Sequence, residues 1–112
     1  MFGMSKKIIA SSLISDTVKI KGTVESTSEL YIDGVIEGPV KTKILIVGVN
    51  GRIKTSLIEA EKVVVHGLVD GDIDAVSVYL GATARIHGNI SHKDISIENG
   101  AFINGDMKQK RG

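Results

Sequence analysis

Several residue types that often guide the reading of a sequence are missing here. The 112-residue chain contains no cysteine, which excludes a disulfide framework and thiol ligands for a metal. Tryptophan is absent, and two tyrosines and two phenylalanines supply all the aromatic rings. The net charge of +1 gives no electrostatic basis for binding nucleic acid, and no apolar run approaches the ~20 residues of a membrane span. These absences leave one domain with an aliphatic core.

What the chain does contain is a five-residue motif that recurs six times. It reads apolar, polar, glycine, turn-former, apolar, with threonine replacing glycine in the third copy. The copies start 16 or 17 residues apart, at Ile20, Ile36, Ile53, Val69, Ile86 and Ile103. A short fixed period indicates a stack of equivalent coils, because each repeat buries its apolar face only against its neighbours.

Alternating apolar and polar residues within and before each motif predict short strands with one face inward. Stacking the coils aligns four apolar columns, two of them within the motif. The first motif column is Ile20, Ile36, Ile53, Val69, Ile86 and Ile103, and the second is Val24, Val40, Leu57, Ile73, Ile90 and Met107. Three strands and three corners fit one coil. The sequence therefore predicts an all-β, single-domain parallel β-helix of about six coils with a triangular cross-section.

The repeats set the expected boundaries. The β-helix is expected over residues 16–107, after a flexible N-terminal arm at 1–15 and before a short basic tail at 108–112. The arm places apolar side chains beside paired lysines, which suits an anionic membrane surface. We expect membrane contact through Met1, Phe2, Met4, Lys6 and Lys7. An ordinary disordered start accounts equally well for these residues.

The motif glycine has two explanations. It adopts a positive φ at a corner, or it lies where only a hydrogen atom fits. Turn-formers follow it, which indicates a nearby corner. Thr55 in the third copy favours limited space, because a β-branched residue at positive φ is an outlier. The polar residue before the glycine alternates in charge from coil to coil, which predicts a ladder that fixes the register of the strands.

His66, His87 and His92 raise one alternative, a trimeric β-helix metalloenzyme of the carbonic-anhydrase type. Against it, His66 and His87 occupy ordinary outward positions, and no carboxylate is specially placed to orient a zinc ligand. No nucleophile elbow, catalytic carboxylate pair or Cys/His pair is present. Residues 48–55 approach a phosphate-binding loop, but the core residue Ile53 replaces its second glycine. The sequence thus predicts no enzyme, metal, cofactor or nucleotide site.

The C-terminal coil has no cap. Phe102 takes the outward position that Arg52 and Arg85 hold in earlier coils, and an unpaired terminal strand is a template for another chain. Two adhesive ends give a filament rather than a closed dimer. We expect a polymerisation interface formed by Phe102, Ile103, Met107, Ile20 and Val24. A monomer with its arm or tail folded over one end is the alternative.

The segments Ile32–Gly38, Val49–Ile53 and Val65–Gly71 resemble the bactofilins, polymer-forming bacterial cytoskeletal proteins. The likeness covers residues 14–107. It implies a right-handed β-helix that polymerises end to end into non-polar filaments without nucleotide. It also implies a cytoplasmic location and membrane attachment through an N-terminal peptide, which Met1–Lys7 resembles. A C-terminal aromatic important for polymerisation in this family aligns with Ile103, beside Phe102.

The sequence and this resemblance together predict a non-enzymatic cytoskeletal scaffold. Its expected partners are further copies of the chain, the inner surface of the cell membrane, and envelope or cell-wall proteins, with no nucleic acid. Its expected role at the inner face of the membrane is to organise cell shape or to localise envelope enzymes.

Overall fold

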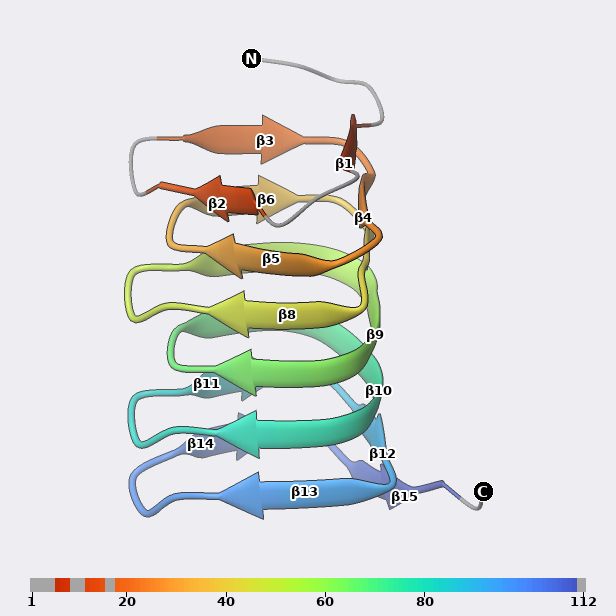
Figure 1. Ribbon diagram of the computed structural model, residues 1–112. Helices are drawn as coiled ribbons and strands as arrows, with labels where there is room; N and C mark the ends of the chain where they lie inside the picture. Colours follow the sequence, from red (N-terminus) through yellow and green to blue (C-terminus); the bar gives the residue numbers. More distant parts are fainter. Residues whose placement is uncertain (1–5, 9–11, 16–17, 111–112) are drawn as a thin grey trace.

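The computed structural model describes residues 6–8, 12–15 and 18–110. In these ranges the chain forms fifteen strands, all paired in parallel in one sheet, and no helix. The strands wind around a right-handed solenoid with its termini at opposite ends (Figure 1). Five full turns run from β3 to β13, and incomplete turns add β1 and β2 at one end and β14 and β15 at the other. The predicted parallel β-helix is confirmed, with slightly fewer full coils than expected.

Three flat faces make up the solenoid. The first face holds β3 (Lys19–Lys21), β6 (Val35–Glu37), the start of β9 (Arg52–Val65), the start of β10 (Leu68–Leu80), β11 (Arg85–His87) and β14 (Phe102–Asn104). The second holds β1 (Lys6–Ile8), β4 (Val24–Ser26), β7 (Val40–Lys41), the middle of β9 and β10, β12 (Ile90–His92) and β15 (Met107–Gln109). The third holds β2 (Ser12–Ile14), β5 (Glu29–Ile32), β8 (Ile44–Val47), the ends of β9 and β10, and β13 (Asp94–Ile97).

The N-terminal segment departs from the flexible arm expected over residues 1–15. Lys6 pairs with Val24, and Ser12 pairs with Leu30, so β1 and β2 add an incomplete turn to the stack. Neither strand carries the repeat motif, and three residues are too few for periodicity to be read from a sequence. The other end also reaches further than expected, because β15 continues to Gln109.

Stacked aliphatic columns fill the interior. Of the first motif column, Ile20 is 5% exposed and the next four members are at most 1% exposed. The second column differs from the prediction at one place, because Leu57 is 38% exposed and Ile58 is fully buried. Ile58 pairs with Val40 and Ile73, which places it in the column in place of Leu57. The third turn therefore carries one extra residue at its first corner.

This extra residue explains the missing glycine. Five motif glycines have φ between +121° and +153°: Gly22, Gly38, Gly71, Gly88 and Gly105. Thr55 has no positive φ, because the register shifts by one residue where it faces Gly71. Its hydroxyl oxygen accepts a hydrogen bond from the Leu57 N–H at 3.1 Å. A Cβ at Gly71 would lie 2.1 Å from the Thr55 carbonyl oxygen. Positive φ and limited space thus both hold, and the inference from Thr55 against positive φ was wrong.

Candidate assembly surfaces

The C-terminal end of the stack is open. Among the described strands, β13, β14 and β15 each have only one neighbour, so one edge of each backbone is unpaired. Large apolar side chains lie beside these edges: Phe102 is 46% exposed, Met107 is 48% exposed and Ile97 is 42% exposed. Unpaired edges flanked by apolar side chains form a template for another rung of strands.

Three of the residues that the sequence places in a polymerisation interface lie at this end. Phe102 and Ile103 are on β14, and Met107 begins β15. Ile103 is half-buried because it packs against the core. The Phe102 ring lies against His87 of the preceding turn, with ring centroids 5.8 Å apart. Sequence reasoning did not select Ile97, although it ends one of the four predicted columns and could have been found there.

The N-terminal end is arranged differently. Ile20 is nearly buried, and its strand β3 pairs only with β6 within the described chain. Val24 is fully buried, and its strand β4 is paired on one side with β1 and on the other with β7. The expectation that Val24 contacts another subunit is therefore corrected, because β1 already covers it. Among the residues of known burial near this end, Val18 is an exposed apolar side chain, at 39%.

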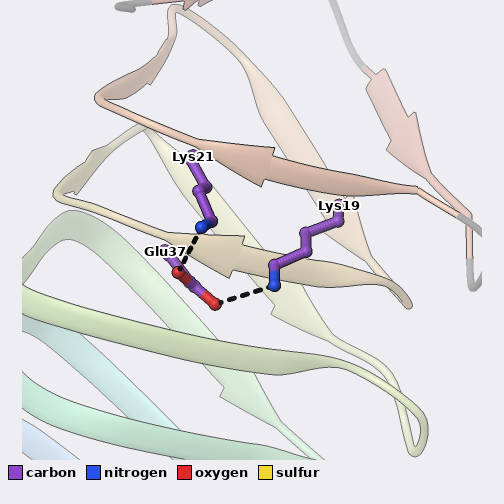
Figure 2. A network of polar contacts seen from close by, with 3 residues as sticks. All are labelled: Lys19, Lys21 and Glu37. Carbon is purple, nitrogen blue, oxygen red and sulfur yellow. Dashed lines mark ion pairs between the residues drawn. The ribbon is translucent and has the colours of Figure 1, made fainter. Parts of the chain in front are cut away.

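An ion-pair ladder lies beside this end on the first face (Figure 2). The Glu37 carboxylate is 3.2 Å from the Lys19 ammonium nitrogen and 3.9 Å from that of Lys21. The hydrogen bond from Lys19 and the positive charges nearby hold the pKa of Glu37 below its ordinary value. Continuing down the face, Glu37 stands next to Lys54, and Lys54 next to Asp70. Exposed pairs contribute little each, so the ladder acts mainly to disfavour wrong registers.

The C-terminal residues are held onto the stack. Lys110 forms an ion pair with Asp74 on β10, and its backbone N–H donates to the His92 carbonyl oxygen. The Gln109 side-chain amide donates to the Lys93 carbonyl oxygen at 3.2 Å. These contacts lie on the second face and leave the edges of β13 and β14 open.

The three histidines do not converge within the subunit. His66 lies at a corner and contacts the Tyr79 ring, and His87 lies on the first face. His92 lies on β12 of the second face and is buried, with 7% exposure. The His92 Nδ1 atom is buried without a hydrogen-bond partner. Over the residues that the structure describes, no three histidine, aspartate or glutamate side chains gather as metal ligands. Nothing in this arrangement favours the metalloenzyme alternative.

Of the expected membrane-contact residues, Met1, Phe2 and Met4 lie outside the described residues. Lys6 and Lys7 belong to β1, whose backbone pairs with β4. No helix in the described ranges has the length and apolar character needed to cross a bilayer.

Comparison with known proteins matches this architecture. The sequence pattern of the bactofilins, described as polymer-forming cytoskeletal proteins, matches residues 12–108. Bactofilin BacO of Myxococcus xanthus (strain DK1622) is 28% identical over 108 residues, which are 92% of this chain and 86% of BacO. The solid-state NMR structure of the cytoskeletal bactofilin BacA superimposes with a TM-score of 0.82 at 36% identity, covering 91% of this chain and 98% of that one.

A second solved structure is similar to this fold. It is the crystal structure of a phenylalanine-to-arginine mutant of a bactofilin from Thermus thermophilus, with a TM-score of 0.58 and 28% identity. It covers 82% of this chain and 98% of that one. A parallel β-solenoid with open terminal rungs and a matching sequence pattern defines a polymer-forming cytoskeletal protein. The chain belongs to the bactofilin family.

Proposed function

We propose that this protein assembles end to end into filaments without nucleotide, through the open C-terminal rung. The carrying observation is that the edges of β13, β14 and β15 are unpaired beside exposed Ile97, Phe102 and Met107. Fully burying such a side chain contributes ~1.5–3 kcal/mol, whereas joining two bodies costs ~4–15 kcal/mol. The apolar contacts alone barely offset that cost, so continued backbone hydrogen bonding is part of the proposed contact.

Electron microscopy of the purified protein without nucleotide tests this proposal. Wild-type protein should form filaments, whereas Phe102→Arg and Ile103→Arg should give dispersed subunits whose circular dichroism remains β-rich. Val49→Arg is the matched control, because Val49 is 67% exposed in the turn between β8 and β9 and lies on no terminal rung. Micrographs that show only monodisperse wild-type monomers would refute the proposal of end-to-end assembly. Undisturbed filaments in both rung variants would exclude this end as the interface.

The filament is proposed to lie at the inner face of the cell membrane and to act as a non-enzymatic scaffold. There it would organise cell shape or localise envelope enzymes. This part is supported by the apolar and basic residues at the start of the chain and by the family's cytoskeletal character. Many weak N-terminal contacts in one filament add up through avidity. Removing residues 2–5, which precede β1, should release filaments from vesicles containing anionic lipid. Undiminished co-sedimentation would count against membrane contact through this segment.

A further inference from the structure

The outside of the third face carries one apolar column beside a mostly polar one. Its second outward column holds Tyr31, Ile46, Val64 and Tyr79 in four successive turns, aligned by direct strand pairing, and continues to the polar Ser96 in the fifth. Tyr31 is 38% exposed and the other three are partly exposed. On the second face the matching column is entirely polar: Glu25, Lys41, Glu59, Asp74, Ser91 and Lys108. Outward strand positions that face water are normally polar, so an apolar column across four turns marks a contact surface.

The order of residues in this column indicates what it contacts. Aromatic, aliphatic, aliphatic, aromatic reads the same in both directions along the stack. A two-fold axis parallel to the strands, between β8 and β9, would place Tyr31 on Tyr79 of a second copy and Ile46 on Val64. Both copies share the ~4.8 Å spacing between rungs, so all four contacts fall into register at once. Such a contact is isologous, with the same surface used by both copies.

Charges at the rim of the face fit the same axis. Lys43 and Glu61 lie in the second and third turns, at the corner between the second and third faces, and both are exposed. Within the described chain neither side chain has an ion-pair partner. The two-fold axis sets Lys43 of each copy against Glu61 of the other. Along the first outward column, Glu29 meets Ser77 and Ile44 meets Lys62, so no like charges are opposed.

The surface is also hollowed where the second copy would enter. A hollow of about 520 Å³ lies over the later turns of this face, lined by Val64, Tyr79 and the short side chains of Ser77 and Ser96, among others. In the two-fold arrangement the ring of Tyr31 from the second copy reaches the level of Tyr79, at the edge of this hollow. Shape therefore agrees with the apolar pattern and the rim charges.

We infer that the third face is a self-complementary docking surface that pairs two copies of this chain side by side, with their stacks antiparallel. The pairing deepens the proposed filament function by joining neighbouring filaments laterally. It uses a side face rather than an end, so the two proposals can fail separately.

Cross-linking tests the register, because the chain has no cysteine of its own. Tyr31→Cys and Tyr79→Cys proteins are mixed, assembled and treated with a short bis-maleimide. The mixture should give a covalent dimer, and neither variant alone should do so. Two copies of residue 31 lie three rungs apart in this arrangement, about 14 Å along the stack. Equal cross-linking of Tyr31→Cys alone, or none in the mixture, overturns the pairing.

Exchanging the charges at positions 43 and 61 provides a second test of the lateral pairing. Lys43→Glu should convert paired filaments in electron micrographs to single ones, because the new carboxylate at position 43 would oppose Glu61 twice, once in each copy. The double variant Lys43→Glu/Glu61→Lys should restore the pairs. If the wild type forms only single filaments and no cross-link, the lateral pairing is refuted and end-to-end assembly is supported. The third face would then bind another kind of partner. Cross-linked dimers without filaments support the pairing and reject the filament proposal.

Discussion

Replacing Gly88 with alanine tests why glycine recurs at the corners. Gly88 has a φ of +151°, a backbone conformation that alanine adopts only at a cost of about 1–3 kcal/mol. An added Cβ would lie 2.0 Å from the Gly71 carbonyl oxygen of the turn before. Ordinary contact begins at 3.4 Å, so the two turns must separate by about 1.4 Å at this corner.

That separation disturbs the hydrogen bonds around the corner. Across these two turns, the Ile73 N–H donates to the Asn89 carbonyl oxygen at 2.9 Å, and the Asn89 N–H donates to the Asp72 carboxylate at 3.0 Å. Each hydrogen bond contributes roughly 0.5–1.5 kcal/mol. With the strain in φ, Gly88→Ala should lower the free energy of unfolding by about 2–6 kcal/mol, a large share of the ~5–15 kcal/mol typical of a domain.

Urea unfolding followed by circular dichroism, at one fixed protein concentration, measures this loss. Fixing the concentration matters because assembly adds to apparent stability. Gly81→Ala is the matched control. Gly81 has no positive φ, and its added Cβ would meet the His66 ring, 2.3 Å from Nδ1, a side chain that can rotate away. It should cost about 1 kcal/mol or less. Equal losses in the two variants would refute the combined role of φ and backbone clash.

Two further predictions concern the third turn and the charge ladder. Ile58→Ala should lower the free energy of unfolding by about 2–5 kcal/mol and Leu57→Ala by less than about 1 kcal/mol, because only Ile58 is buried. Urea unfolding measures both losses, and the reverse order would place Leu57 in the core column. The pKa of Glu37 is lowered in the folded protein from its ordinary value of 4.5, so its stabilisation is present above that value and lost as the pH falls through the lowered one. The midpoint temperature of thermal unfolding should therefore fall less steeply between about pH 6 and about pH 3 in Glu37→Gln than in the wild type.

Periodicity predicted most of the fold because the period is repeated so often. The burial of residues in the first column, such as Ile36 and Ile86, could be predicted without locating the turns, since every copy of the motif supplies one inward residue at the same position. The assignment of Leu57 to the second core column was wrong because a fixed spacing cannot detect an extra residue inserted at a corner. The replacement of glycine by Thr55 was the visible signal, since a hydroxyl that bonds its own backbone suits a bulged corner better than a positive φ.

The ends were harder to predict than the middle. Val24 was assigned to a contact surface because nothing before Ile20 carries the motif, yet β1 pairs with β4 through its backbone alone. Backbone pairing needs no particular side chain, so a three-residue strand leaves almost no trace in a sequence. Phe102 was visible because an aromatic ring takes the place that Arg52 and Arg85 hold in earlier turns, although Val35 and Leu68 occupy the same column in the turns between.

The contrast between ends and sides explains how one repeat could support two kinds of assembly. Along the stack, any terminal rung offers the same unpaired backbone and the same rung spacing as an interior one, so end contacts need little specific chemistry. The third face has its backbone hydrogen bonds within the sheet and can specify a partner only through side chains. A self-complementary contact there requires a particular order of residues, such as that of Tyr31, Ile46, Val64 and Tyr79. Lateral pairing should therefore be lost by single substitutions on this face that leave end-to-end growth intact.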